Sequence, residues 1–374
     1  MKKIYLSSPN MGGDELYYIQ DAFEKNWIAP LGENVDEFEK EVAKRVDCNF
    51  CVALSSGTAT VHMALKAAGV EQGDIVFCPS LTFAASANPI IYQGATPVFI
   101  DCDEDNWNMS PVALQKAFEK YPNPKAVIVV HIFGQAAKLD EIVEICKKHN
   151  TVLIEDAAES LGTTYKGKET GTFGKYGVFS FNGNKIITTS GGGMLVCENE
   201  DTANKVKFWI TQARDNERYY QHTEIGYNYR MSNILAGIGR GQLKVLDTRI
   251  KQKTDIYNRY KKAFEEISAI KMIPVTDYSK PNFWLTCITI NKNANIAPLD
   301  IILALEKENI ESRYIWKPLH LQPVFEKYDF FTECENGSYS EEIFKYGVCL
   351  PSDTNMTLQE QDRVIEIVKS LFNK

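Results

Sequence analysis

Residues 126–159 read AVIVVHIFGQAAKLDEIVEICKKHNTVLIEDAAE. An apolar run at Ala126–Val130 is followed by apolar residues at helical spacing over Leu139–His149 and by a second apolar run at Thr151–Ile154. Two short apolar runs that flank a helical pattern predict a β-α-β unit with parallel, buried strands. Three acidic residues, Glu155, Asp156 and Glu159, follow the second apolar run. The unit therefore places negative charge at the end of a strand that is predicted to be buried.

The same alternation extends outward from this unit, from Phe50 to about Cys197. It is typical of a mainly parallel sheet that is covered by helices. Further strands are predicted at Phe50–Leu54, Asp74–Phe77, Thr96–Ile100, Tyr176–Phe181 and Met194–Cys197. Further helices are predicted at Thr58–Ala68, Phe83–Tyr92 and Val112–Lys120.

The pattern becomes helical after Asp201, and the run from Ser232 to about Ile267 reads as one long helix or two, long enough to connect domains. The rest of the chain predicts a smaller α+β domain. Its elements are a strand near Trp284–Ile290, a helix near Leu299–Asn309 and a final helix after Thr357. A length of 374 residues, about 2.5 times a usual domain of roughly 150 residues, also favours two domains.

Composition narrows the class of protein. Hydrophobic residues make up 44% and charged residues 24%, as in an ordinary globular protein. The net charge of −8 argues against a surface that tracks nucleic-acid phosphates, so no nucleic-acid partner is expected. No apolar run approaches the roughly 18 residues that a membrane span needs, and no secretion signal is recognisable at the start. We therefore expect a cytoplasmic protein.

Nine cysteines, an odd number spread from Cys48 to Cys349, favour free thiols in a reducing compartment over a disulfide framework. Cys48 and Cys51 form a C-x-x-C motif, but no second pair stands at zinc-site spacing and the motif leads into an apolar run. We predict ordinary buried or half-buried thiols here and no metal site.

Four polar features follow predicted strands, the place where α/β folds bind ligands. The first is Ser55-Ser56-Gly57-Thr58, where small residues and a helix N-terminus favour an anion, although a plain helix cap would look the same. The second is the acidic end of the strand before Ala157. A carboxylate there can hold a cationic ring nitrogen protonated. Metal binding is the alternative, but no cluster of histidine and carboxylate completes such a site.

The third feature is Lys185 in the turn that follows the strand ending at Phe181, before the glycines of residues 191–193. A lysine in such a turn is a candidate covalent nucleophile, whereas a solvated surface lysine is the simpler alternative. The fourth is the aromatic, amide and guanidinium cluster Gly226–Arg230, which also suits an ordinary surface contact. The joint order of the four features is more specific than any one of them.

In that order the sequence resembles the sugar aminotransferases of the DegT/DnrJ/EryC1/StrS family, pyridoxal-phosphate enzymes of the aspartate aminotransferase fold (fold type I). The similarity extends from Pro30-Leu31-Gly32 through residues 318–322 (PLHLQ) to residues 349–352 (CLPS). The resemblance implies a three-layer α/β/α large domain with a mixed, mainly parallel sheet at residues 1–247. A smaller α+β domain would occupy residues 248–374.

The resemblance also implies the cofactor, pyridoxal 5′-phosphate, and its contacts. Lys185 would hold the cofactor covalently, Asp156 would pair with the pyridine nitrogen and Glu159 would lie near the ring hydroxyl. The other cofactor contacts that it implies are Gly57, Thr58 and Ser180 at the phosphate, Phe83 stacked on the ring, and Asn228 at the phosphate of a neighbouring subunit. The last contact implies a homodimer with shared active sites.

Family members that carry histidine at the lysine position remove a sugar hydroxyl, so Lys185 favours transamination. Residues 26–32 and 182–194 look most like the enzymes that aminate C4 of UDP-linked 4-keto-6-deoxy-N-acetylhexosamines, as in the bacillosamine branch. The donor would be L-glutamate, and the products 2-oxoglutarate and a UDP-4-amino-4,6-dideoxy-N-acetyl-glucosamine for bacterial glycan biosynthesis. Candidate substrate contacts, each also compatible with a structural role, are Asn26, Trp27, Ile28, Ala29, Arg230, Arg313, Tyr314, Trp316, Lys317 and His320.

Three alternatives remain open. The substrate can be another keto sugar, linked to dTDP or GDP and aminated at C3 or C4. A nicotinamide-dependent Rossmann oxidoreductase is disfavoured because no G-x-G-x-x-G follows the first predicted strand. A non-catalytic pyridoxal-phosphate sensor is disfavoured because the chain shows neither a DNA-binding module nor a basic patch.

Overall fold

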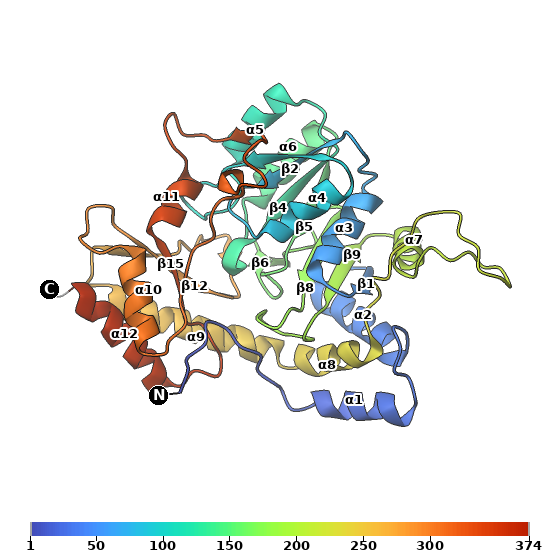
Figure 1. Ribbon diagram of the computed structural model, residues 1–374, viewed down its shortest axis with the longest axis horizontal. Coiled ribbons are helices and arrows are strands. Elements are labelled where there is room, and N and C mark those ends of the chain that lie inside the picture. Colours follow the sequence, from blue (N-terminus) through green and yellow to red (C-terminus); the bar gives the residue numbers. More distant parts are fainter. Residues whose placement is uncertain (1, 373–374) are drawn as a thin grey trace.

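One eight-stranded sheet organises the larger part of the molecule in the computed structural model, which describes residues 2–372 (Figure 1). The strand order is β1-β9-β8-β5-β4-β2-β3-β14. The pairs from β8 to β14 are parallel, whereas β9 is antiparallel to both neighbours. The bounds are β1 Phe50–Leu54, β2 Ile75–Pro79, β3 Thr96–Ile100, β4 Ala126–Val130, β5 Val152–Asp156, β8 Tyr176–Ser180, β9 Gly193–Cys197 and β14 Phe330–Phe331.

Helices cover both faces of this sheet because the buried strands are apolar on both sides. In β5, for example, Ile154 belongs to one core and Leu153 to the opposite one. The first face packs against α3 (Gly57–Ala67), α4 (Asn88–Tyr92) and α7 (Glu200–Ile210). The helices on the second face are α2 (Glu33–Val46), α5 (Pro111–Lys120), α6 (Leu139–Lys148) and α8 (Asn233–Leu243). The predicted three-layer α/β/α architecture with a mixed, mainly parallel sheet is confirmed.

A second, antiparallel sheet in the order β10-β12-β15-β13 forms the smaller α+β unit. Its strands are β10 Ile270–Met272, β12 Thr286–Ile290, β13 Arg313–Tyr314 and β15 Gly347–Leu350. A separate core joins this sheet to α9 (Leu246–Phe264), α10 (Pro298–Lys307) and α12 (Leu358–Phe372). A third, small sheet contains β6 Thr164–Tyr165, β7 Lys168–Glu169 and β11 Ser279–Lys280.

The run predicted from Ser232 to about Ile267 is two helices, α8 and α9, which follow each other along the lower side of the molecule in Figure 1. Two segments lie on the other side of the domain boundary predicted at residue 247 from the part of the sequence to which they belong. Ile4 packs into the core of the smaller unit, and Phe330–Phe331 pairs with β3 of the large sheet. The boundary itself stays a prediction.

The prediction of one helix over Phe83–Tyr92 is wrong. The segment forms a short 3₁₀ helix η1 (Ala84–Ser86) and then α4, which begins with Pro89 in its first turn, where the missing N–H of proline is tolerated.

The remaining elements are α1 Glu15–Glu24, α11 Tyr339–Tyr346, η2 Ile132–Gly134 and η3 Leu319–Leu321. Cys48 is half-buried, Cys51 is buried, and both are free thiols. Among the described helices, none has the length and apolar character that crossing a membrane requires.

Candidate active site

A cavity of about 420 Å³ lies where the ends of β5 and β8 meet the N-terminus of α3. Its walls also include residues of the smaller unit, so both parts of the chain form it. The predicted residues that line it are Gly57, Thr58, Phe83, Asp156, Glu159, Ser180, Lys185, Arg313, Tyr314 and Trp316. These positions span more than two thirds of the chain, and the fold brings them to one place.

The N-terminus of α3 forms the anion-binding end of the cavity. Ser56 caps the helix by accepting a hydrogen bond from the backbone N–H of Ala59 at 3.1 Å. The first N–H groups of a helix have no partner within it and carry partial positive charge. A Cβ atom on Gly57 would lie 2.9 Å from Cβ of Ser180, so glycine is what lets the helix start and the Ser180 hydroxyl approach each other. This end suits a phosphate group.

Asp156 is the last residue of β5, and its side chain lies on the α3 side of the sheet because it alternates with Glu155. Its Oδ2 accepts a hydrogen bond from the Ser86 hydroxyl at 2.7 Å, and its Oδ1 accepts one from the N–H of Ala158 at 3.2 Å. The carboxylate is only 6% exposed. It is therefore a fixed negative group that can face a protonated ring nitrogen.

Lys185 extends into the cavity between a carboxylate and an indole ring. Its Nζ lies 3.6 Å from Oε1 of Glu159 and 4.1 Å from the ring centroid of Trp284. Glu159 also accepts a hydrogen bond from the N–H of Phe133 at 2.7 Å. Burial raises the pKa of Glu159 to about 7, although the Lys185 ammonium opposes this shift. The Glu159 carboxyl group therefore gains or loses its proton near neutral pH.

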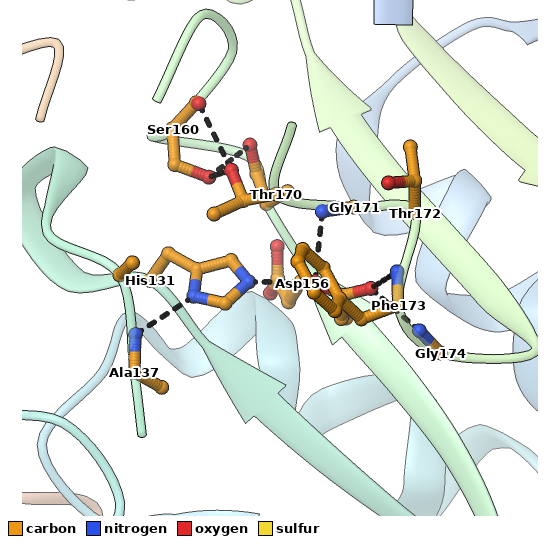
Figure 2. A network of polar contacts seen from close by, with 12 residues as sticks. His131, Ala137, Asp156, Ser160, Thr170, Gly171, Thr172, Phe173 and Gly174 are labelled. Carbon is orange, nitrogen blue, oxygen red and sulfur yellow. Dashed lines mark hydrogen bonds and ion pairs between the residues drawn. The ribbon is translucent and has the colours of Figure 1, made fainter. Parts of the chain in front are cut away.

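On the opposite face of β5, a second polar network fixes the strand end (Figure 2). Nδ1 of His131 accepts the N–H of Ala137 at 3.2 Å, so Nε2 carries the proton and donates to Glu155 at 3.0 Å. Glu155 also accepts backbone N–H groups from Gly171, Phe173 and Gly174, at 2.8, 2.5 and 2.6 Å. This fully buried carboxylate anchors the loop after β7 to β5, and the residue next to it is Asp156.

The polar groups fit the cofactor that the sequence predicts. The site provides an amine at Lys185, a carboxylate at Asp156 and an anion-binding helix start at Gly57. Pyridoxal 5′-phosphate has an aldehyde that reacts with an amine, a ring nitrogen that pairs with an acid, and a phosphate. Phe83 is 60% exposed and lies 5.8 Å from the Trp316 ring, which leaves an aromatic face free at the cavity mouth.

Several predicted residues do not line the cavity of a single chain. The segment 26–29 follows α1 and is largely exposed, and its backbone binds Asn233 at the start of α8. Asn228 is exposed and Arg230 faces Asp36 at 3.8 Å. Lys317 is exposed as well. Asn228 is predicted to contact the cofactor phosphate of a neighbouring subunit. The structure of one chain therefore does not test this contact.

His320 is bound by protein groups outside the cavity. Its Nδ1 lies 2.6 Å from the Ser80 hydroxyl, its Nε2 lies 3.1 Å from Glu341, and its ring stacks on Phe330 at 3.7 Å. Both ring nitrogens already have partners within the chain. This arrangement favours the structural alternative for His320.

Two residues of the site were missed by the sequence analysis, Ser86 and Trp284. Ser86 binds Asp156 from 70 positions away, and Trp284 binds the carbonyl of Asn184 from 100 positions away. In the sequence, Trp284 marks only the predicted start of a strand. A local pattern shows neither role, since each depends on a partner that is brought close by the fold.

Comparison with known sequences agrees with the geometry. The sequence model of the DegT/DnrJ/EryC1/StrS aminotransferase family matches residues 9–369. EpsN of Bacillus subtilis, which carries the name of a pyridoxal phosphate-dependent aminotransferase, is 52% identical over all of this chain and 96% of its own length. The GDP-perosamine synthase of Caulobacter vibrioides is 34% identical, with 98% of this chain and 97% of the relative covered.

A further relative is a UDP-4-amino-4,6-dideoxy-N-acetyl-beta-L-altrosamine transaminase of Campylobacter jejuni, 30% identical over 94% of this chain and 93% of its own. Among solved structures, a DegT/DnrJ/EryC1/StrS aminotransferase from Brucella abortus superimposes with a TM-score of 0.87 at 27% identity. It covers 96% of both chains. The architecture and the sequence similarity thus extend over nearly the whole chain.

Proposed function

This chain belongs to the DegT/DnrJ/EryC1/StrS aminotransferase family, and on that basis we propose that it transfers the amino group of L-glutamate to C4 of a UDP-linked 4-keto-6-deoxy-N-acetylhexosamine. It is a pyridoxal-phosphate enzyme. The observation that carries the proposal is the cavity in which Lys185, Asp156 and the start of α3 converge. The products would be 2-oxoglutarate and a UDP-4-amino-4,6-dideoxy-N-acetyl-glucosamine, a building block for bacterial glycans.

The residues of the cavity have separate tasks. When bound, the cofactor supplies an electron sink for the carbon that loses a proton. Asp156 keeps the ring nitrogen protonated because opposite charges in a poorly solvated site stabilise each other. Lys185 takes and returns the proton at its Nζ, which Glu159 and Trp284 hold in place. Phe83 and Trp316 cover the cavity mouth with aromatic surface.

The nucleotide is the finer part of the proposal. Residues 26–32 and 182–194 favour UDP-linked N-acetyl sugars, and a relative named for a UDP-linked sugar supports that choice. A GDP-linked 4-keto sugar is the second candidate, since a GDP-perosamine synthase is similar over nearly the full chain. Arg313, exposed at the cavity rim, is the group that we expect to contact the diphosphate of either nucleotide.

We also propose a homodimer with shared active sites. A single chain leaves large apolar side chains exposed on two segments, α1 and the loop after α7. They are Leu16, Tyr17 and Phe23 on α1, and Tyr219, Tyr220 and Ile225 in the loop. That loop projects from the body of the molecule and leads back to Asn228 (Figure 1). Exposed apolar groups of this size favour burial against a second copy.

The nine free thiols favour a reducing, cytoplasmic setting.

The test is a substrate panel. Purified holoenzyme is incubated with glutamate and UDP-, GDP- and dTDP-linked 3-keto and 4-keto sugars, and release of 2-oxoglutarate is followed. We expect the highest kcat/KM for the UDP-linked 4-keto-N-acetyl sugar. A preference of about tenfold or more for a GDP- or dTDP-linked sugar would overturn the substrate assignment and leave the reaction class intact. Lys185→Ala is the control and should lose both the visible absorbance band and turnover.

A further inference from the structure

The turn that carries Lys185 belongs to neither a helix nor a strand. One backbone hydrogen bond, from the N–H of Lys185 to the carbonyl of Asn182 at 3.0 Å, closes it, and distant side chains hold it as well. The carbonyl of Asn184, the residue before Lys185, accepts two hydrogen bonds. Ser7 Oγ donates one at 3.0 Å and Trp284 Nε1 donates the other at 2.7 Å. Ser7 and Trp284 lie 177 and 100 positions away along the chain. The backbone beside Lys185 is therefore held from the N-terminal segment and from the smaller unit.

One buried ammonium joins these two donors. Lys253, in α9, is 2% exposed, and its Nζ donates to Ser7 Oγ at 3.1 Å and to the Trp284 carbonyl at 3.0 Å. The third donor of this ammonium binds the carbonyl of Ser352 at 2.6 Å. A lysine has three N–H donors, and all three are used here. Ser7 Oγ accepts from Lys253 and donates its own proton to Asn184, so the contacts form a continuous chain.

Trp284 is also fixed from its other side. Its backbone N–H donates to Oδ1 of Asn282 at 2.9 Å, and Nδ2 of Asn282 donates to the carbonyl of Glu159 at 2.9 Å. The Trp284 ring, whose centroid lies 4.1 Å from Nζ of Lys185, is thereby tied to Asn184, the neighbour of Lys185, and through Asn282 to Glu159. The ring has little freedom to turn.

Burying the charge of Lys253 is costly. Burial lowers the pKa of Lys253 to about 7, although the Asp353 carboxylate opposes this shift, and the three hydrogen-bond partners of the ammonium are uncharged oxygens. Uncharged acceptors compensate an ammonium only in part for the water that it loses. Two of its three hydrogen bonds go to Ser7 and Trp284, the residues that bind the Asn184 carbonyl beside Lys185.

We propose that Lys253 is a positioning residue for the amine of Lys185 and that it acts through Ser7 and Trp284. The inference rests on the proposed role of Lys185 as the lysine that holds the cofactor. Because the ammonium also binds Ser352, the position of the amine depends on the N-terminal segment, α9 and the segment after β15 together. A small shift of an amine that must reach a reacting carbon lowers the rate of the chemical step more than it lowers substrate affinity.

The test compares Ser7→Ala, Trp284→Phe and Lys253→Met with a matched control, Ser8→Ala. Ser8 is half-buried like Ser7, but its hydroxyl accepts a hydrogen bond from the side chain of Asn355, and within the described residues it does not bind Asn184. Trp284→Phe keeps an aromatic face near Lys185 and removes the indole N–H. Each holoenzyme is measured by its single-turnover rate with glutamate, its glutamate affinity, and the circular dichroism of its visible band.

We expect Ser7→Ala and Trp284→Phe each to lower the single-turnover rate about three- to tenfold, as loss of one hydrogen bond predicts, and to alter the visible circular dichroism. Glutamate affinity should stay within about twofold of wild type, and Ser8→Ala should match wild type in every readout. Lys253→Met removes three donors at once, so its rate should fall further. Adding Ser7→Ala to Lys253→Met should then cost less than it costs in wild type.

Wild-type rates and wild-type circular dichroism in both Ser7→Ala and Trp284→Phe would overturn the inference. Strictly additive effects of Ser7→Ala and Lys253→Met would overturn it as well, because Lys253 would then not act through Ser7. If Lys253→Met fails to fold, Lys253→Gln takes its place in the comparison with Ser7→Ala, because it removes the ammonium but keeps a polar side chain at the same position. A visible band that persists in Lys185→Ala would instead contradict the proposed role of Lys185, which makes the two failures distinguishable.

Discussion

Glu159 is the residue at which the electrostatics of the cavity can be tested directly. Burial raises its pKa from 4.5 to about 7. A carboxyl group with a raised pKa in the folded state stabilises the fold fully below pH 4.5, and this contribution is lost as the pH rises through 7. Glu159→Gln has no proton to lose. Between pH 4.5 and 8, the cofactor-free wild type should therefore lose up to about 3 kcal/mol more unfolding free energy than the variant.

The measurement is urea unfolding of both proteins, without cofactor, at pH 5 and pH 8. Glu169→Gln is the matched control for the visible spectrum. Glu169 is also buried with its pKa raised to about 7, but it pairs with Arg45 and does not line the cavity. Both variants should flatten the pH dependence of stability, whereas only Glu159→Gln should change the spectrum of the holoenzyme. Equal pH dependence in wild type and Glu159→Gln would show that Glu159 titrates normally.

At the scale of elements, we expect the start of α3 to determine how tightly the cofactor phosphate is held. Gly57→Ala would place a Cβ atom 2.9 Å from Cβ of Ser180, so the helix start or β8 must shift. We expect the dissociation constant of pyridoxal 5′-phosphate to rise about tenfold or more. Gly183→Ala is the control, because a Cβ there meets only the Ser190 carbonyl at 4.0 Å. Titration of the two cofactor-free proteins measures the effect, and equal affinities would contradict it.

The strand β5 shows how far a local pattern defines an element. The apolar run predicts a strand that ends at Ile154, but the observed strand continues to Asp156. Two charged residues remain in the ladder because each finds partners on its own face. Glu155 binds the imidazole of His131 and three backbone N–H groups, and Asp156 binds Ser86. The spacing of apolar residues does not predict that a charged residue belongs to a buried strand, because the partners that bind the charge come from other segments of the chain.

At the scale of the whole molecule, the proposed sharing of active sites between subunits leads to a prediction about mixed dimers. Lys185→Ala and Asn228→Ala, each inactive or strongly impaired alone, are co-expressed with different tags. If Asn228 serves the neighbouring subunit, about half of the dimers are mixed and one of the two sites in each is intact. The mixture should then regain roughly a quarter of wild-type activity. A mixture no more active than either variant alone would show that each site is built from one chain.

The sequence by itself determined the alternation of strands and helices, because the apolar period depends only on which faces a segment buries. It also determined the order of small-residue turn, acidic strand end and lysine, and the structure brings Gly57, Asp156 and Lys185 to one cavity. Their roles toward the cofactor remain predictions.

Only the tertiary structure decided what holds these groups. Ser86 at Asp156, Trp284 beneath Lys185, and Lys253 behind both Ser7 and Trp284 have no local signature. The contacts join positions up to 246 residues apart. The physical reason is that a hydrogen bond depends on atoms that meet within about 3 Å, and chain folding alone brings such distant atoms together.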